Sequence, residues 1–353
     1  MALLLLCAGC DPFNTDFADL ESAVDYEASA PVVDDTARTE LRVMTWNIKF
    51  GGGRIDFFFD CHGDRVLMSE SEVVENLEGL KDLIDAQAPD ILLLQEVDVL
   101  SKRSAYVDMV QWLLDHTELS HGVYASQWKA DFVPSDGIGR VDSGNAILSR
   151  WPIDNATRIA LPLIGEQDGL TQYFYLKRNI LRGQIQVPGA GELHVINTHL
   201  AAYSSDGTKK KQIDQVVALM DELDAAGKTF IMGGDLNTMP AGTEKRTGFD
   251  DQACEGDRFS GGDSESEETW LDDLYASYEP AIALDTYQAD NSPWFTHSTA
   301  KDVLWNRKLD YLFTNAIFDQ SQSLTIQTED VGGYPTMPLS DHAPTFTIWE
   351  VAP

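Results

Sequence analysis

The feature that most constrains this fold is a series of apolar runs, each closed by a short polar cluster. The clusters are Trp46-Asn47, Gln95-Glu96, Asn197-Thr198-His199, Gly234-Asp235-Leu236-Asn237 and Ser340-Asp341-His342. Apolar runs of this length are typical of buried strands, so each cluster is expected where a strand leaves the core. If these strand ends meet in one pocket, they combine amides, carboxylates and imidazoles. Such a set suits a hard divalent cation and a phosphate ester, and it indicates a hydrolase.

The pattern between the clusters predicts sheets covered by helices. Apolar residues at helical spacing predict a helix over residues 70–87, and two more are expected near 106–116 and 210–225. Strands are expected near 41–46, 91–94, 146–148, 180–187, 193–197, 229–232, 309–313 and 345–349. Because the clusters run from Asn47 to His342, a single site needs nearly the whole chain. We therefore expect one domain over residues 41–351.

Two acidic segments flank or interrupt this domain. Residues 11–40 hold nine acids and one base, which predicts a disordered tether. Residues 241–273 hold eleven acids and three bases, with many Gly and Ser, which predicts a flexible surface insertion. The run Lys209-Lys210-Lys211 is interpreted as the solvated start of a helix.

The net charge limits the class of partner. With 25 basic and 58 acidic residues, the formal charge is -33. Such a surface repels nucleic acid and anionic lipid unless cations intervene, which argues against a dedicated tight DNA binder. Hydrolysis of nucleic acid at a metal-filled site is still compatible with it, since the local field at a cation differs from the net charge.

The first ten residues, Met-Ala-Leu-Leu-Leu-Leu-Cys-Ala-Gly-Cys, resemble the end of a bacterial lipoprotein signal. On this interpretation Cys10 carries a lipid, and the protein is exported and anchored to a bacterial membrane on the periplasmic or cell-surface side. Cys7 stands where such signals usually have Leu, and no basic residue precedes the apolar stretch. An ordinary cleaved signal and a chance apolar start are the alternatives. Cys61 and Cys254 either pair or remain two separate thiols.

Individual residues in the clusters carry specific chemistry. Glu96 follows an apolar run, and a carboxylate there is costly unless it binds a metal or a cation; the alternative is a salt-bridged surface Glu. Asp235 and Asn237 could hold water and a phosphate oxygen, or simply form an Asx turn. Asp310 lies inside an apolar strand, so a histidine partner such as His199 or His342 would compensate its charge. A structural role is the alternative for each histidine.

Taken together, the clusters resemble the endonuclease/exonuclease/phosphatase superfamily, which includes DNase I, over about residues 41–350 and in the same motif order. The resemblance implies a DNase I-like α/β (α+β) fold, a four-layer α/β/β/α sandwich of two mixed β-sheets. It further implies a monomeric enzyme that uses Mg²⁺, or alternatively Mn²⁺, to drive in-line attack of water on a phosphoester.

The resemblance also implies a role for each matching residue. Asn47, Glu96 and Asp341 correspond to the metal site, and His199, Asn237 and Arg178 correspond to residues that contact phosphate. Asp235, Asn237, His199 and His342 correspond to catalytic residues, with Asp310 orienting His342. Either Asp235 or His342 takes the proton from water. The segment Ser143-Gly144-Asn145-Ala146 lacks the Tyr that abasic-site endonucleases carry nearby.

Three functions follow in order of preference. The first is a lipid-anchored or exported Mg²⁺-dependent hydrolase of a small phosphoester or a phospholipid headgroup. The second is DNase-like endonuclease or exonuclease action on nucleic acid. The third is a non-catalytic binding protein that keeps the fold.

Overall fold

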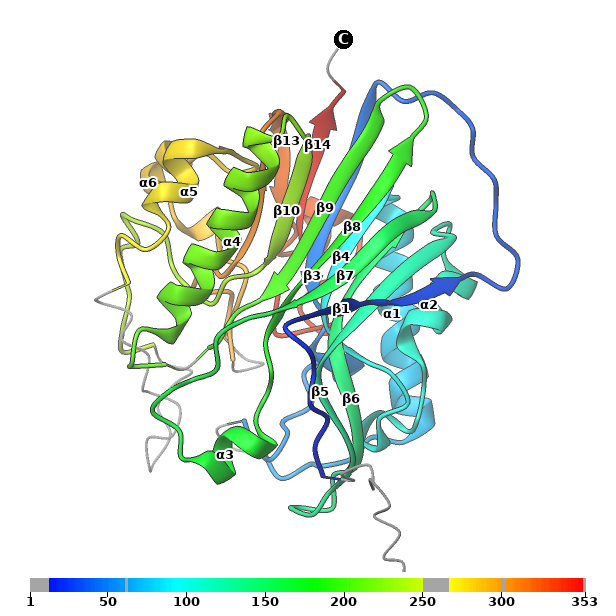
Figure 1. The fold of residues 1–353 in the computed structure, drawn as a ribbon, viewed down its shortest axis with the longest axis vertical. Coiled ribbons are helices and arrows are strands. Elements are labelled where there is room, and N and C mark those ends of the chain that lie inside the picture. The colour runs from blue at the N-terminus through cyan, green and yellow to red at the C-terminus, as the bar shows by residue number, and fades with distance from the viewer. Residues whose placement is uncertain (1–12, 61–62, 203, 250–266, 300–302, 352–353) are drawn as a thin grey trace, which may run out of the picture.

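The computed structural model describes residues 13–60, 63–202, 204–249, 267–299 and 303–351. In this part of the chain, two seven-stranded mixed sheets pack face to face between outer helices (Figure 1). The first sheet has the order β1 (Leu20–Ser22), β7 (Ile153–Ala160), β8 (Asn179–Val187), β9 (Gly191–His199), β10 (Phe230–Asp235), β12 (Asp310–Thr314) and β11 (Glu279–Pro280). The second has the order β13 (Ile317–Thr325), β14 (Thr345–Glu350), β3 (Glu40–Asn47), β4 (Ile91–Asp98), β6 (Gly139–Ser149), β5 (His121–Val133) and β2 (Val24–Glu27). The predicted four-layer sandwich is confirmed.

The helices of the described residues are α1 (Glu70–Gln87), α2 (Met109–His116), α3 (Gly169–Phe174), α4 (Thr208–Ala225), α5 (Asp272–Ser277), α6 (Leu284–Ala289) and α7 (Glu329–Gly332). Helices α1 and α2 cover the outer face of the second sheet and α4 and α5 that of the first, whereas α3 lies on a loop at one end of the molecule (Figure 1). The prediction for residues 70–87 is confirmed to the residue, because strong local signals mark both ends of α1. Ser69 and Glu72 form a capping box at its start, and Ala88 ends it in a left-handed conformation just before Pro89.

Three apolar clusters correspond to the interfaces between the layers. The cluster between the two sheets includes Val43 and Leu93 of the second sheet with Val195 and Ile231 of the first. A second cluster packs the outer face of the second sheet against α1 and α2, and a third packs the first sheet against α4 and α5. Successive residues of β3 and β4 alternate between two of these clusters, since strand side chains alternate in direction. Both faces are apolar, so the sequence shows continuous apolar runs.

Strand direction and register bring the polar clusters to one end of the sandwich. β3 and β4 are parallel neighbours in one sheet, as are β9 and β10 in the other. Because parallel strands end at the same edge of a sheet, the polar residues at their carboxyl ends lie together. Across the first sheet, Asp235 lies opposite His199 on one side and opposite Asp310 on the other. The pairing therefore aligns His199, Asp235 and Asp310 in one row.

The prediction of a disordered tether over residues 11–40 is wrong for part of that segment. β1 pairs with β7 at the edge of the first sheet, and β2 pairs with β5 at the edge of the second. Composition missed this because edge strands keep their charges in water while the backbone supplies the hydrogen bonds. Asp25 and Glu27 are exposed, whereas the Tyr26 hydroxyl donates to Asp108 Oδ2 at 3.2 Å.

Several predictions fall on residues outside the described ranges. These are the lipid-bearing Cys10 with the rest of the signal-like segment, Cys61 and Cys254, and most of the acidic insertion, residues 250–266. Residues 272 and 273, which the predicted insertion included, begin α5. Within the described ranges, no helix combines the length and apolar character needed to cross a membrane.

Candidate active site

The structure brings the predicted site residues together at one end of the two sheets. Asn47 comes from the end of β3, Glu96 from β4, His199 from β9 and Asp235 from β10. The Asn47 side-chain nitrogen Nδ2 lies 3.2 Å from Glu96 Oε1 and 3.1 Å from Asp235 Oδ2. One amide thus joins carboxylates that belong to different sheets.

Glu96 reaches this position through an irregularity in β4. The register with β6 shifts between Leu94 and Val97, and Glu96 has a φ of 55°. A left-handed conformation costs a residue with a Cβ about 1–2 kcal/mol, and such strain is characteristic of functional sites. Desolvation in the crowded pocket, followed by the nearby Asp341 carboxylate, raises the pKa of Glu96. The bulge therefore holds an acid where its negative charge is disfavoured.

Asp235 is presented by a glycine that lets two strands approach closely. Gly234 has a φ of 140°, and a Cβ there would lie 1.9 Å from the Thr198 carbonyl oxygen. Asp235 Oδ1 accepts a hydrogen bond from Asn237 N at 2.9 Å. Burial and the neighbouring Asp310 raise the pKa of Asp235 to about 7. Near neutral pH this carboxylate is therefore poised between its protonated and charged forms.

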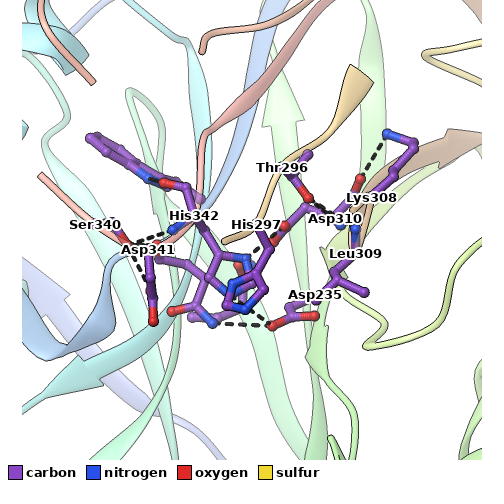
Figure 2. A network of polar contacts seen from close by, with 12 residues as sticks. Asp235, Thr296, His297, Lys308, Leu309, Asp310, Ser340, Asp341 and His342 are labelled. Atoms are coloured by element: carbon purple, nitrogen blue, oxygen red, sulfur yellow. Dashed lines mark hydrogen bonds and ion pairs between the residues drawn. The ribbon is translucent and has the colours of Figure 1, made fainter. Parts of the chain in front are cut away.

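His342 pairs with Asp310 in the arrangement that Figure 2 shows. His342 Nδ1 lies 2.8 Å from Asp310 Oδ2, and His342 Nε2 lies 3.7 Å from Asp235 Oδ2. Burial lowers the pKa of His342, but Asp310 and Asp235 outweigh that effect and raise it to about 10. The buried imidazole is therefore held protonated by carboxylates on both of its edges.

The segment that carries Asp341 and His342 is fastened to β3. Ser340 Oγ donates to the Asn47 carbonyl at 2.7 Å and accepts from His342 N at 3.1 Å (Figure 2). The Trp46 indole donates to the His342 carbonyl at 2.8 Å. These bonds fix the loop relative to the strand that ends in Asn47.

His199 differs in charge from His342. His199 Nε2 lies 3.4 Å from Asp235 Oδ2. Burial, together with the positive charges of Arg178 and His342, lowers the pKa of His199 well below its ordinary value. His199 is therefore neutral, and its contact with Asp235 is a polar contact rather than an ion pair.

Arg178 lies just before β8 and is also buried. Its Nη1 donates to Gln127 Oε1 at 2.8 Å, while Nε has no hydrogen-bond partner among the described residues. Burial lowers the pKa of Arg178, and the carboxylates of Glu96 and Asp235 act in the opposite direction. A guanidinium with spare donors beside these acids is suited to an anionic ligand.

Asn237 has a left-handed backbone, with a φ of 49°, and is held by its neighbours. Its Nδ2 donates to the Leu200 carbonyl at 3.1 Å, and its own carbonyl accepts from Lys209 Nζ at 2.6 Å. Lys209 also pairs with buried Glu267 at 2.8 Å. The interpretation of Lys209 as solvated is wrong, because the residue lies under the turn that carries Asn237.

Three charged or polar residues near the site were missed by the sequence reasoning. They are Lys49, whose Nζ lies 3.0 Å from Asp60 Oδ2 and 3.7 Å from Asp341 Oδ2, Lys209, and His297, whose ring lies against that of His342. His297 ends no apolar run, so the signal used for the other histidines did not apply to it. Lys49 follows the Trp46-Asn47 cluster, two residues after Asn47. This closeness to a predicted site residue could have marked Lys49 as a neighbour of the site.

Two residues of the polar clusters instead connect the sheets. Gln95 Nε2 donates to Asn197 Oδ1 at 2.7 Å, and Asn197 Nδ2 donates to the Leu94 and Ala146 carbonyls, each at 2.8 Å. Both amides are buried. Apart from Gln95 Oε1, which has no hydrogen-bond partner among the described residues, their side-chain atoms are paired within the sandwich, in keeping with a structural role.

The match to known proteins covers most of this chain. Residues 44–342 match the model of the Endonuclease/Exonuclease/phosphatase family. The chain belongs to this family. Its members are metal-dependent phosphoesterases. No curated protein matches the chain.

Solved structures share the family fold with this chain. An endonuclease/exonuclease/phosphatase from Beutenbergia cavernae DSM 12333 is 20% identical, with a TM-score of 0.56 over 89% of this chain and 72% of that one. The human Nocturnin catalytic domain with bound sulfate anion is 18% identical, with a TM-score of 0.56 over 94% and 98% of the two chains. A functionally unknown conserved protein from Enterococcus faecalis V583 is 16% identical, with a TM-score of 0.55 over 88% and 100%. At these identities the likeness is one of fold.

The residues present fit the metal on which this family depends. Glu96 and Asp235 both contact Asn47, with Asp341 near Glu96, and the pKa values of Glu96 and Asp235 are raised because burial and neighbouring acids disfavour their charges. A divalent cation would relieve that repulsion. Oxygen ligands of this kind suit Mg²⁺ or Mn²⁺. Ligand atoms of Asp235, Asp310 and His342 also lie within 4.8 Å of one another, which makes them a further candidate group.

Proposed function

We propose that this protein is a Mg²⁺-dependent phosphoester hydrolase in which water attacks the phosphorus in line with the leaving oxygen. The observation that carries the proposal is the meeting of Glu96 and Asp235 from opposite sheets beside the His342–Asp310 pair. A site that only bound a phosphate would be better served by cations than by this concentration of carboxylates. The family to which the chain belongs supports the same reaction class.

Glu96 and Asn47 would hold the metal, with Asp341 beside them. Bound there, Mg²⁺ would neutralise the charge that develops on the phosphoryl oxygens. In the structure the amide nitrogen of Asn47 faces both carboxylates, so binding through its oxygen requires the amide to turn over. Lys49, 3.7 Å from Asp341 Oδ2, would hold that acid in its charged form.

Proton transfer would use the unequal proton affinities of Asp235 and His342. Asp235, with a pKa raised to about 7 by burial and Asp310, can accept the proton that water loses as its oxygen bonds to phosphorus. His342 is held as an imidazolium, since its carboxylate neighbours outweigh burial and raise its pKa to about 10. It would stabilise the negative charge on the phosphoryl group or donate its proton to the leaving oxygen.

The phosphate would be held by donors that remain available around this acidic centre. The neutral His199 can donate from a ring nitrogen, and the amide of Asn237 keeps a second N–H beyond the one bonded to Leu200. The buried Arg178, whose Nε has no hydrogen-bond partner within the described ranges, would add positive charge near the phosphate. These groups come from different parts of the fold, since His199 ends β9, Asn237 follows β10 and Arg178 precedes β8.

The preferred substrate would be a small phosphoester or a phospholipid headgroup. The formal charge of -33 opposes close approach of a long polyanion, because duplex DNA binding draws most of its affinity from basic residues. A single phosphoester needs only the local donors of the site.

The test is hydrolysis by the purified full chain with Mg²⁺, then with EDTA, on plasmid DNA, RNA, sphingomyelin, phosphatidylinositol phosphates and bis-p-nitrophenyl phosphate. We expect EDTA-sensitive turnover of a lipid or small ester in preference to DNA. Preferred cleavage of DNA or RNA would replace the substrate proposal with a nuclease. Absence of turnover with both Mg²⁺ and Mn²⁺ would favour the binding-protein alternative.

We also propose that the protein is exported and anchored through a lipid on Cys10. The support is the sequence of residues 1–10, which resembles a lipoprotein signal. Mass spectrometry of protein extracted from membranes should show a diacylglyceryl group on Cys10. An intact Met1 terminus or an unmodified Asp11 terminus would refute the anchor.

A further inference from the structure

His297 lies opposite His342 because two backbone segments pair as in a sheet. Ala343 N donates to the Thr296 carbonyl at 2.6 Å, and Ser298 N donates to the Asp341 carbonyl at 3.1 Å. His297 and His342 form the antiparallel bridge between these two bonds. In such a non-hydrogen-bonded pair the side chains come especially close. The ring centroids are 4.4 Å apart. Figure 2 shows the two labelled histidines beside each other.

Both rings keep a nitrogen that could bind a metal ion. His342 Nδ1 faces Asp310 at 2.8 Å, and Nε2, which lies 3.7 Å from Asp235 Oδ2, would give up its proton when it binds the ion. A carboxylate behind a histidine is the usual support of a histidine that ligates a metal, since it fixes the ring and its tautomer. His297 Nε2 lies 3.5 Å from Thr299 Oγ1, while its Nδ1 is buried with no hydrogen-bond partner in the described part of the chain. A buried ring nitrogen without a hydrogen-bond partner is a place where a bound ion would supply the missing contact.

Asp341 provides a third ligand beside the two rings. Ligand atoms of His297, Asp341 and His342 all lie within 4.8 Å of one another. A tetrahedral zinc ion with bonds of about 2.0–2.2 Å needs its ligand atoms about 3.4 Å apart, so these atoms would draw closer together when the ion binds. Two imidazoles and one carboxylate, with water in the fourth position, make a typical zinc set, whereas Mg²⁺ prefers oxygen ligands.

We propose that His297, Asp341 and His342 form a second metal site that takes zinc and that withdraws His342 from the hydrolytic site when filled. The ion would sit among the ligand atoms of His297, Asp341 and His342. It competes with Lys49 for Asp341, but Lys49 keeps Asp60 as a partner at 3.0 Å.

The first test measures zinc binding directly and needs no substrate. The purified full chain, treated with a chelator and then dialysed, is titrated with zinc alone by calorimetry at one fixed pH. His297→Gln should weaken the tightest zinc site by at least about 10–100-fold, the loss typical even of a supporting residue around a bound metal. His116→Gln is the matched control, because it removes an exposed imidazole at the end of α2. Equal zinc affinity in the wild type and His297→Gln would overturn the proposal.

A spectroscopic readout keeps the test informative if His297→Gln fails to fold. Cobalt(II) in a four-coordinate site absorbs visible light strongly, whereas six-coordinate cobalt absorbs weakly. The wild-type chain should therefore develop an intense visible band with Co²⁺ that zinc removes stoichiometrically. A spectrum of six-coordinate cobalt only, unaffected by zinc, would count against the site.

The predicted inhibition by zinc rests on the proposed hydrolase function. A failure of that function can be told apart from a failure of the zinc site, because zinc binding is measured separately. With Mg²⁺ held constant, zinc should inhibit turnover of bis-p-nitrophenyl phosphate in the wild type. The zinc concentration for half inhibition should rise at least about tenfold in His297→Gln, each protein being compared with its own zinc-free rate. Zinc binding without any Mg²⁺-dependent turnover would refute the hydrolase but leave the zinc site. Inhibition that is equal in both proteins would refute the role of His297.

Discussion

The pair of Asp310 and His342 allows the proposed chemistry to be tested quantitatively. In the native protein His342 Nδ1 lies 2.8 Å from Asp310 Oδ2. Asp310→Asn removes one negative charge but keeps a side-chain oxygen that can accept a hydrogen bond from His342 Nδ1. In the native site Asp310 and Asp235 overcome the effect of burial and raise the pKa of His342 to about 10. A neighbouring opposite charge typically moves a pKa by about 1–3 pH units. We expect the pKa of His342 to fall by that amount, which removes about 1–4 kcal/mol of stabilisation from the imidazolium.

The assay follows the ring signals of isotopically labelled histidines by NMR as the pH is varied. Asp154→Asn is the matched control, because it removes the same charge from an exposed position on β7. The turnover rate of Asp310→Asn should fall about 10²–10⁴-fold if His342 supplies acid–base or charge stabilisation. The double variant with His342→Ala should lose little more than His342→Ala alone, since residues that act as a unit are not additive. An unchanged titration of His342, or losses that multiply in the double variant, would refute the reasoning.

Three further outcomes are expected. Glu96→Ala should abolish turnover and weaken Mg²⁺ binding in calorimetry, and retained activity at ordinary Mg²⁺ would exclude Glu96 as a ligand. Gly234→Ala should lower the free energy of unfolding by about 1–3 kcal/mol or more, since the added Cβ would lie 1.9 Å from a carbonyl oxygen of β9. Gly169→Ala is the control, because a Cβ added at Gly169 would have no other atom within 4 Å. The folded pKa of His342, about 10, lies above its unfolded value of about 6.5, so its contribution to stability is complete below about pH 6.5 and disappears as the pH rises through about 10. Urea unfolding of the wild type and Asp310→Asn should accordingly differ at neutral pH and converge above about pH 10, and a pH-independent difference would contradict this.

Much of the architecture was predictable because local signals agreed with the tertiary structure. The apolar runs before Asn47 and Glu96 became central strands that are buried on both faces, and the capping residues of α1 marked its ends. The convergence of the polar clusters followed from one assumption, that the strands deliver their ends to the same edge. The match of motif order to a known family gave the number of sheets, which periodicity alone does not contain.

What the sequence did not predict depends on contacts between distant segments. Edge pairing of residues 20–27 is made by backbone hydrogen bonds, so their acidic composition carried no trace of it. Lys209 looked solvated within a basic run, yet its partner Glu267 lies 58 positions further along the chain. His297 meets His342 only through the pairing of two loops. In each case the missing information is a long-range partner, which residue spacing within one segment cannot supply.

The N-terminal segment sets how far the body of the protein can lie from a membrane if Cys10 carries the anchor. Lys177 Nζ donates to the Thr15 carbonyl at 3.0 Å, so the chain is already attached to the body of the protein five residues after Cys10. Five residues span at most about 18 Å when fully extended. A fully extended tether of thirty residues, the length predicted from the sequence, would reach about 100 Å. The protein would therefore lie close to the lipid surface, within reach of lipid headgroups.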